Sequence, residues 1–204
     1  KSVMYRPGQF VFLNFVVSKK DTQLNESHPF SIASSPDNTN LTFYVKSLGD
    51  FTDAVKKLKI GTTAEIEGAF GRFVPANYGS YSQIWIAGGV GITPFLSMSK
   101  SLKNIPEKVV LFYSVKSRSE MIEYSTLKDL IPDEFRNFKF VPYITSEYNN
   151  KLIDVDFISQ NAGGIVNKQI FICGPPSMTR SLVGQLRKKG VKKSRIHSEE
   201  FFIN

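Results

Sequence analysis

The feature that most restricts the fold lies after residue 80, where short apolar segments alternate with helix-like segments. The apolar segments are residues 83–89, 108–115, 138–145, 169–174 and 195–201. Strands buried on both faces are apolar along most of their length, unlike the alternating strands of a half-exposed sheet. Such strands separated by helices indicate a parallel sheet covered on both faces. Residues 81–204 are therefore predicted to form an α/β domain with a doubly wound sheet.

The first 80 residues have a different pattern. β-branched and aromatic residues typical of strands occur in residues 8–17, 30–35, 41–48 and 63–70. Pro, Gly, Asn and Asp separate these segments. Residues 50–59 instead have the spacing of an amphipathic helix, which Gly61 ends. Residues 1–80 are therefore predicted to form an antiparallel, barrel-like domain.

Composition narrows the classes of site. No run of 18 or more apolar residues and no signal-peptide pattern occurs in the sequence. Cys173 is the one cysteine, which excludes an internal disulfide, and with only two histidines no metal site is expected.

The net charge of +8 is uneven, because residues 81–204 carry 17 Lys and Arg against 11 Asp and Glu. The densest basic run, residues 187–195, fits a solvated helix end. It lacks the interleaved aromatics and motif of a nucleic-acid site, so no nucleic acid is expected. Attraction of an anionic cofactor or membrane surface stays open as an alternative.

A glycine-rich loop, residues 87–95 (AGGVGITPF), follows the first strand of the α/β half. Glycines at such a turn let the backbone approach a pyrophosphate, whose charge the following helix N-terminus accepts. Pro94 replaces the usual final small residue of the dinucleotide fingerprint, and proline suits a first helical turn. The loop predicts a dinucleotide site; a tight structural turn is the alternative.

The segment after the next strand bears on which dinucleotide binds. It contains Ser114, Lys116 and Arg118, with no carboxylate before Glu120. Cations and hydroxyls suit a ribose 2′-phosphate, whereas an acidic residue suits the 2′-hydroxyl of NADH. We therefore expect NADPH, with NADH possible, although a solvated loop can carry the same residues.

Two further segments end strands with unusual residues. Cys173 and Gly174, in FICGPPSM (171–178), lie at the predicted carboxyl end of a central strand, where such sheets bind ligands. The alternative for Cys173 is a small core residue. Pro29, in HPFSIASS (28–35), belongs on an edge or at the first residue of a strand, because proline cannot donate to the ladder.

Together these segments resemble the ferredoxin–NADP reductase superfamily of flavin reductases. The matching motifs occur in the family's order: PGQF (7–10), HPFSIASS (28–35), KSLGDFT (46–52), GAFGRF (68–73), AGGVGITPF (87–95), FICGPPSM (171–178) and HSEEF (197–201). The resemblance implies a partial antiparallel Greek-key β-barrel FAD domain (1–80) followed by an α/β doubly wound NAD(P)H domain (81–204). The His-Pro-Phe form resembles the ferric reductase and NADPH oxidase branch.

The resemblance also assigns roles to residues. It implies that Phe30 stacks on the isoalloxazine of FAD, that Ser31 hydrogen-bonds its N5, and that His28 replaces the family's arginine. Asp50 is expected to cap the insert helix. The implied catalytic residues are Ser31, Cys173, Glu199 and Phe201, with Phe202 as an alternative to Phe201. The implied cofactor-binding residues are His28, Pro29, Phe30, Ser31, Lys46, Ser47, Gly49, Asp50, Thr52, Gly88, Gly89, Gly91, Thr93, Pro94, Ser114, Lys116, Arg118, Cys173, Gly174 and Pro175.

By the same resemblance, the chain is expected to pass hydride from NAD(P)H to FAD and single electrons to haem or ferric iron. The family's barrel has further strands before PGQF, so the chain is expected to be a fragment. The acceptor is then a haem-bearing membrane domain of the same parent chain, with this domain at the cytoplasmic face of the membrane. Alternatives are a soluble reductase of an oxygenase, a siderophore-iron reductase, and a flavin-free assembly module.

Overall fold

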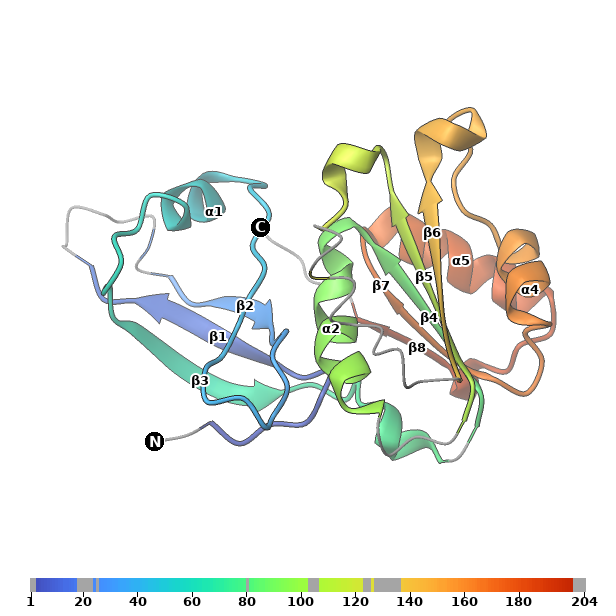
Figure 1. Cartoon of the computed structure of the whole chain (residues 1–204), viewed down its shortest axis with the longest axis horizontal. Coiled ribbons are helices and arrows are strands. Elements are labelled where there is room, and N and C mark those ends of the chain that lie inside the picture. Colours follow the sequence, from blue (N-terminus) through green and yellow to red (C-terminus); the bar gives the residue numbers. More distant parts are fainter. Residues whose placement is uncertain are drawn as a thin grey trace.

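The computed structural model of the chain describes residues 3–17, 24, 26–79, 81–102, 107–122, 126 and 137–199. They form two lobes that lie side by side (Figure 1). We call the described residues up to 79 the β lobe and those from 81 the α/β lobe. The two predicted fold types, an antiparallel sheet followed by a parallel α/β sheet, are confirmed. The placement of the domain boundary at residue 80 stays a prediction.

The β lobe holds an antiparallel sheet of strand order β2-β1-β3. The strands are β1 (Phe10–Phe15), β2 (His28–Ser31) and β3 (Ala64–Phe70), and the helix α1 (Asp50–Val55) lies beside them. Val11 and Leu13 alternate inward along β1 and form the lobe's buried core with Ile32. Pro29 lies on β2, an edge strand of the described sheet, as proline requires.

Three local predictions for this lobe are wrong. Residues 41–48 form no strand. Their side chains divide between two neighbours, since Phe43 packs on the β-lobe core and Tyr44 packs on the core of the other lobe. The helix ends at Val55 rather than near residue 59, and its N-cap is Gly49 rather than Asp50. Asp50 is already helical, so its carboxylate does not cap the helix.

The α/β lobe holds a five-stranded sheet of order β6-β5-β4-β7-β8, in which every pair is parallel. The strands are β4 (Gln83–Gly88), β5 (Val109–Val115), β6 (Phe138–Ile144), β7 (Gln169–Cys173) and β8 (Ile196–Glu199). All residues of β4, β5 and β7 are buried, as their apolar sequences predict. The order reverses at β4, and such a switch point is where α/β sheets bind ligands.

Helices cover both faces of this sheet (Figure 1). The helix α2 (Thr93–Lys100) packs on the face toward the β lobe, and α4 (Val155–Ala162) and α5 (Pro176–Lys188) pack on the other. Among the described residues, none of the helices combines the length and apolarity needed to cross a bilayer. Short 3₁₀ helices are η2 (Pro75–Tyr78), η3 (Gly89–Ile92), η5 (Arg118–Glu120), η6 (Thr145–Tyr148) and η7 (Lys193–Arg195).

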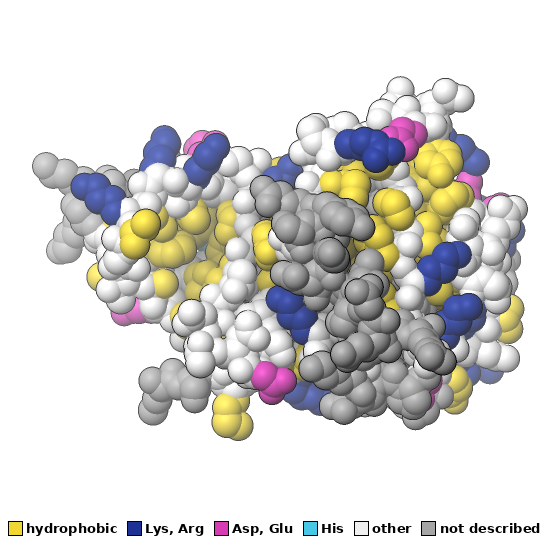
Figure 2. All heavy atoms as spheres, in the orientation of Figure 1, with side chains coloured by type: hydrophobic (Ala, Val, Ile, Leu, Met, Phe, Trp, Pro, Cys, Tyr) yellow, Lys and Arg dark blue, Asp and Glu magenta, His cyan; other side chains and the backbone are white. Residues whose placement is uncertain are grey.

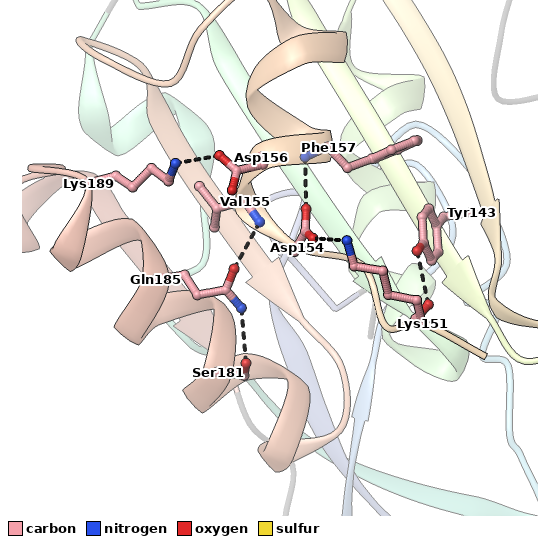
Figure 3. Close-up of polar contacts among 9 residues, drawn as sticks. All are labelled: Tyr143, Lys151, Asp154, Val155, Asp156, Phe157, Ser181, Gln185 and Lys189. Atoms are coloured by element: carbon pink, nitrogen blue, oxygen red, sulfur yellow. Dashed lines mark hydrogen bonds and ion pairs between the residues drawn. The ribbon is translucent and has the colours of Figure 1, made fainter. Parts of the chain in front are cut away.

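Polar side chains fix the start of α4 against α5 (Figure 3). Asp154 caps α4 by accepting a hydrogen bond from the backbone N–H of Phe157 (2.9 Å), and it pairs with Lys151 (2.8 Å). The hydrogen bond from Lys151 is the main reason that the pKa of Asp154 is lowered. Gln185 of α5 accepts a second free N–H, that of Val155 (3.0 Å). The connection from β6 to α4 is thereby held in place at its α4 end.

The two lobes are joined by polar contacts as well as by packing. The hydroxyl of Ser97 on α2 donates to the carbonyl of Ser34 (2.6 Å) in the buried interface. Within the β lobe, the hydroxyl of Tyr5 donates to the same carbonyl (3.0 Å). Lys46 of the β lobe pairs with Glu120 of the α/β lobe (3.1 Å). The bonds of Ser97 and Lys46 therefore cross between the lobes, beside the apolar packing of residues such as Ala33 and Phe73 against Phe95.

Candidate functional site

A cavity of about 320 Å³ lies between the two lobes. Four chain segments meet there: the end of β2, the loop before α1 with the helix's first turn, and the turns after β4 and β7. They contribute the lining residues Pro29, Phe30, Ser31, Tyr44, Val45, Lys46, Leu48, Thr52, Gly88, Gly89, Val90, Gly91, Thr93, Cys173, Gly174, Pro175 and Pro176. Strand ends from the antiparallel sheet and from the parallel sheet therefore face the same cavity.

The β lobe supplies a ring and a hydroxyl to this cavity. Phe30 packs with Phe43 and Phe51, with ring centroids 6.4 and 6.1 Å apart, and it also lines the cavity. Ser31 ends β2 opposite Phe10 and is 8% exposed. The sequence-based expectation required both residues to face the glycine turn after β4, and both line the same cavity as Gly89.

The glycines after β4 have two different structural reasons. A Cβ on Gly91 would overlap the carbonyl oxygen of Cys173, and the Cβ position of Gly174 is 3.0 Å from Gly88. These residues are therefore small because the turns after β4 and β7 touch each other. Gly89 has a φ of +53°, and no atom of the described residues lies within 4 Å of its Cβ position. Its backbone is the open part of the turn.

The turn leads into α2 as the proline predicts. Pro94 lies in the first turn of α2, where its missing N–H costs no hydrogen bond. Thr93 lines the cavity, and its hydroxyl donates to the carbonyl of Val90 (2.7 Å). The start of α2 thus lies beside the cavity, in the arrangement that favours a bound anion.

Cys173 and Glu199 lie opposite each other on neighbouring strands. Burial raises the pKa of the Cys173 thiol, and the charge of Glu199 raises it further, so the sulfur carries its proton at neutral pH. Burial also raises the pKa of Glu199 to about 7. Its Oε2 atom has no hydrogen-bond partner among the described residues, and Oε1 lies 3.0 Å from the Cβ position of Gly71. At neutral pH, the carboxyl group of Glu199, next to Cys173 on the neighbouring strand, is therefore close to half-protonated.

The other predicted residues lie outside the cavity lining. His28 packs against Phe51 of α1 with tilted rings (3.7 Å between ring centroids), and it does not line the cavity. The N–H of Gly49 donates to the hydroxyl of Thr52 (3.1 Å) rather than pointing to open space. The remaining residues that do not line it are Ser47, Asp50, Pro94, Ser114, Lys116, Arg118 and Glu199. Phe201 and Phe202 lie outside the described residues.

Two cations predicted to hold phosphates are already paired with carboxylates. Lys46 pairs with Glu120, and Arg118 pairs with Glu147 at 2.6 Å between Nε and Oε1. Neither carboxylate is a sequence neighbour of its cation, since 74 and 29 residues separate the pairs. Sequence spacing therefore gave no sign of this neutralisation.

A second cavity, of about 340 Å³, adjoins the first. Both include Tyr44, Val45, Lys46, Gly89 and Val90 in their lining. The second continues to the residues after β5, namely Ser119, Glu120 and Ile122. The open glycine turn thus lies between a space next to Phe30 and a space that leads along the edge of the sheet.

The sequence-based prediction missed several lining residues, above all Tyr44, Val45 and Val90. Residues 41–48 were interpreted as a strand of the barrel, which hid their position between the lobes. The alternating apolar and aromatic pattern of these residues is the same for a barrel strand and for a segment that lies between the lobes. Among the described residues, no group of three or more His, Cys, Asp or Glu side chains is placed to hold a metal ion.

The fold and the cavity define the architecture: an aromatic-lined antiparallel lobe faces the glycine turn of a parallel α/β lobe. Residues 1–179 match the family model described as "FAD-binding domain", and the chain belongs to that family. It is an FAD-dependent NAD(P)H reductase domain of the ferredoxin–NADP reductase superfamily, with FAD and NAD(P)H as its cofactors.

Relatives and solved structures agree with this assignment. The chain is 22% identical over 98% of its length to the phenol hydroxylase P5 protein of Acinetobacter pittii, spanning 59% of it. It is 31% identical over 70% of its length to ferric reduction oxidase 8, mitochondrial, of Arabidopsis thaliana, spanning 22% of it. The Amycolatopsis cytochrome P450 reductase GcoB superposes with a TM-score of 0.81 at 21% identity, with 98% of this chain and 62% of that one covered.

Proposed function

We propose that the chain is the reductase domain of a ferric reductase or NADPH oxidase-like membrane protein, passing electrons from NAD(P)H through FAD to haem or ferric iron. The observation that carries the proposal is that Phe30 and Ser31 share one cavity with the turns after β4 and β7. When bound, FAD supplies the chemistry of accepting a hydride and releasing electrons singly. The protein's task is to hold two rings in contact.

On the flavin side, the proposed roles follow from what each side chain offers. Phe30 provides an aromatic face whose contact with a planar ring is worth about 0.5–1.5 kcal/mol beyond burial. The Ser31 hydroxyl both donates and accepts, so it suits a ring nitrogen that changes between acceptor and N–H donor. Pro29 fixes the backbone before them. Tyr44, from the segment between the lobes, adds a second ring to the lining.

On the nicotinamide side, the open backbone of Gly89 and the start of α2 face the space that a pyrophosphate requires. Cys173 presents a neutral thiol at the end of β7. Glu199 carries its proton on a buried carboxyl oxygen up to about pH 7. We assign Cys173, which lines the cavity, to orienting the nicotinamide, and Glu199, which lies outside the lining on the neighbouring strand, to supporting Cys173.

The membrane partner rests on the His-Pro-Phe motif and on the similarity to ferric reduction oxidase 8, whose own chain is much longer. Under this proposal the acceptor is a haem-bearing membrane domain of the parent protein, and the domain works at the cytoplasmic face of the membrane. The second candidate is a reductase component of an oxygenase. The similarity to the phenol hydroxylase P5 protein favours that candidate.

The test is anaerobic reduction of the FAD-reconstituted chain by NADPH or NADH, followed by the visible absorbance of oxidised flavin. Wild type should bleach rapidly, and Ser31→Ala should bleach about tenfold more slowly, because a hydrogen bond is worth up to about 1.5 kcal/mol and about 1.4 kcal/mol is a factor of ten. Ser35→Ala is the matched control, because Ser35 is equally buried but outside the cavity lining. If neither NADPH nor NADH bleaches the flavin, the proposal is wrong.

A further inference from the structure

The end of the β lobe farthest from the α/β lobe carries exposed lysines and exposed apolar side chains. There β1 ends, the chain leaves α1, and β3 begins (Figure 1). We call Val16, Lys56, Lys57, Lys59 and Ile60 the tip. All five residues are exposed, Ile60 completely and Val16 by 54%. Figure 2 shows basic side chains gathered at this end of the lobe, with apolar ones beside them.

A tight turn holds Ile60 away from the rest of the lobe. The N–H (3.1 Å) and the hydroxyl (2.7 Å) of Thr62 both donate to the carbonyl of Lys59. Gly61 lies inside this turn with a φ of +91°, the positive value that the third position of a type II turn requires. Ile60 is the residue before it, at the second position. The exposure of Ile60 is therefore set by the backbone of a hydrogen-bonded turn.

Val16 is attached to the same end of the sheet. Its N–H donates to the carbonyl of Thr63, the residue after the turn (2.9 Å). Next to this bond, Phe15 and Ala64 form the last pair of the ladder between β1 and β3. The ladder thus places Val16 and the turn of Ile60 together, where neither side chain is part of the lobe's buried core. Both are left to contact a partner.

The three lysines of the tip form no ion pair with a carboxylate among the residues that the structure describes. By contrast, Lys151 and Lys189 of the α/β lobe each pair with one. Asp50 and Asp53 lie in the first turn of α1, before the lysines. The positive charges of the tip are therefore free to attract an external anion.

The helix dipole gives a second reason for lysines at this place, because the C-terminal end of a helix attracts cations. It accounts for Lys56 and Lys57, at the end of α1. Lys59 lies beyond the helix, in the turn that carries Ile60, and the dipole gives no reason for an apolar side chain there. Lysines around an exposed apolar residue instead fit a surface that is negatively charged outside and apolar inside.

We propose that the tip binds the surface of a membrane that contains anionic lipid. Ile60 and Val16 enter the boundary between headgroups and acyl chains, and the three lysines contact the lipid phosphates and carboxylates. A bilayer suits the tip better than a protein does, because a stable protein interface buries about 1,200–2,000 Å², far more than two apolar side chains supply. The tip shares no residue with either cavity, so this contact goes beyond the proposed electron transfer.

Sedimentation of the full chain with lipid vesicles tests the proposal. Vesicles of phosphatidylcholine alone are compared with vesicles of equal parts phosphatidylcholine and phosphatidylserine. Wild type should bind the mixed vesicles at least about tenfold more tightly than the neutral ones, because each lysine near an anionic surface contributes about 1 kcal/mol, or about fivefold. High salt should weaken this binding, because it screens exposed charges.

Two sets of substitutions separate the charges from the apolar contact. Replacing all three tip lysines with Gln should weaken binding to the mixed vesicles about a hundredfold, at about fivefold for each charge. Ile60→Ser should weaken it about tenfold, because its side chain no longer leaves water for the acyl boundary.

The α/β lobe supplies a matched control for each set. Lys188, Lys192 and Lys193 are also exposed, and replacing them together with Gln removes the same charge from the other lobe. Leu152→Ser removes an apolar side chain that is 68% exposed. Both control variants should bind the mixed vesicles as wild type does.

Three outcomes would overturn the proposal. The first is equal binding of wild type to neutral and mixed vesicles, or binding to neither. The second is an equal loss of binding in the control variants. The third is binding that soluble polyglutamate displaces and that Ile60→Ser leaves unchanged, which would assign the tip to an acidic protein.

Flavin reduction keeps this inference separate from the proposed function. Without vesicles, every tip variant should be reduced by NADPH or NADH as fast as wild type, since the tip lies outside both cavities. Flavin reduction without vesicle binding would refute the tip and keep the proposed function. Vesicle binding without flavin reduction would refute the function and keep the tip.

Discussion

The two lobes bury their sheets to very different degrees. In the α/β lobe, every residue of β4, β5 and β7 is buried between two apolar clusters, one on each face. In the β lobe, the buried apolar core around β1 consists of Val11, Leu13 and Ile32. Apolar side chains reach its surface (Figure 2), and Ile66 and Phe70 of β3 are each 39% exposed.

The difference has a physical origin and a functional consequence. A parallel sheet is covered on both faces by its connecting helices, whereas an antiparallel sheet can leave one face to solvent. The turns after β4 and β7 are therefore fixed by a large core, while Phe30 and Ser31 depend on a small one. Most of the chain's stability should lie in the α/β lobe, and the flavin side should depend more on its ligand.

The largest expected effect is a cavity in the α/β core. Phe171 is fully buried in the same cluster as Trp85 and Leu111, so Phe171→Ala should cost about 3–5 kcal/mol of unfolding free energy. Val11→Ala in the β lobe should cost about 2 kcal/mol. Trp85, the one tryptophan, lies in the α/β core and reports on that lobe by fluorescence during urea unfolding.

The Trp85 midpoint should fall in Phe171→Ala and stay near wild type in Val11→Ala. Far-ultraviolet circular dichroism should show the loss in both variants. If Phe171→Ala and Val11→Ala shift the fluorescence midpoint equally, the two lobes unfold as one unit. The proposed difference in stability between the lobes would then be wrong.

The next effect separates the two reasons for glycine in the turn after β4. Gly91→Ala places a Cβ into the carbonyl of Cys173 and should cost about 1–3 kcal/mol as an overpacked contact. Gly89→Ala meets no atom of the part of the chain that the structure describes, so it carries the strain of a positive φ, about 1 kcal/mol. Thermal unfolding should rank the variants in that order. The reverse order would show that packing between the turns is not the constraint.

A smaller effect comes from His197 and Glu199, two partly buried side chains of β8 whose pKa values are shifted in opposite directions. Burial raises the pKa of Glu199 to about 7 and lowers the pKa of His197 to about 4. Between about pH 4.5 and 7, folded Glu199 keeps a proton that the unfolded chain releases, so its contribution to stability falls as pH rises. Between about pH 4 and 6.5, unfolded His197 binds a proton that the folded chain excludes, so its contribution rises with pH.

In wild type, the fall in stability due to Glu199 and the rise due to His197 offset each other between about pH 4.5 and 6.5. Glu199→Gln should leave a stability that rises from pH 4.5 to 6.5, and His197→Asn one that falls over the same range. Each change should amount to about 1–2 kcal/mol after allowance for partial exposure. Melting temperatures across the range provide the measurement. Parallel profiles in the two variants would contradict the opposite shifts.

The smallest effect concerns the ion pair that joins the lobes. Lys46 and Glu120 are partly exposed, so losing the pair should cost at most about 1 kcal/mol, and less at high salt. Their roles differ toward FAD, because Lys46 lines the first cavity whereas Glu120 lines only the second. Lys46→Gln should weaken FAD binding, and Glu120→Gln should preserve or strengthen it by freeing Lys46. Fluorescence titration measures the FAD affinity of both variants. An equal loss of affinity in the two would show that Lys46 acts through its ion pair with Glu120 and not by contacting FAD.

Predictions from sequence succeeded where the cause is local. The apolar segments of residues 81–204 led to a parallel sheet, because burial on both faces leaves no polar alternation. The loop with Gly89 and Pro94 led to a strand–turn–helix, because glycine and proline restrict the backbone directly. The prediction of a strand at residues 41–48 failed because the position of this segment has no local cause. Their pattern fits a strand, but their side chains serve two lobes, which no periodicity shows.

By itself, the sequence determined two sheets of different kinds, the turn that ends β4, and a family whose members bind FAD. Only the tertiary structure decided that Lys46 faces Glu120, that Arg118 faces Glu147, and that Asp50 does not cap its helix. Backbone preferences act within a few residues, so they can be deduced from neighbours in the chain. A charge is neutralised by whatever folding brings within a few ångströms, and those groups lie dozens of residues away.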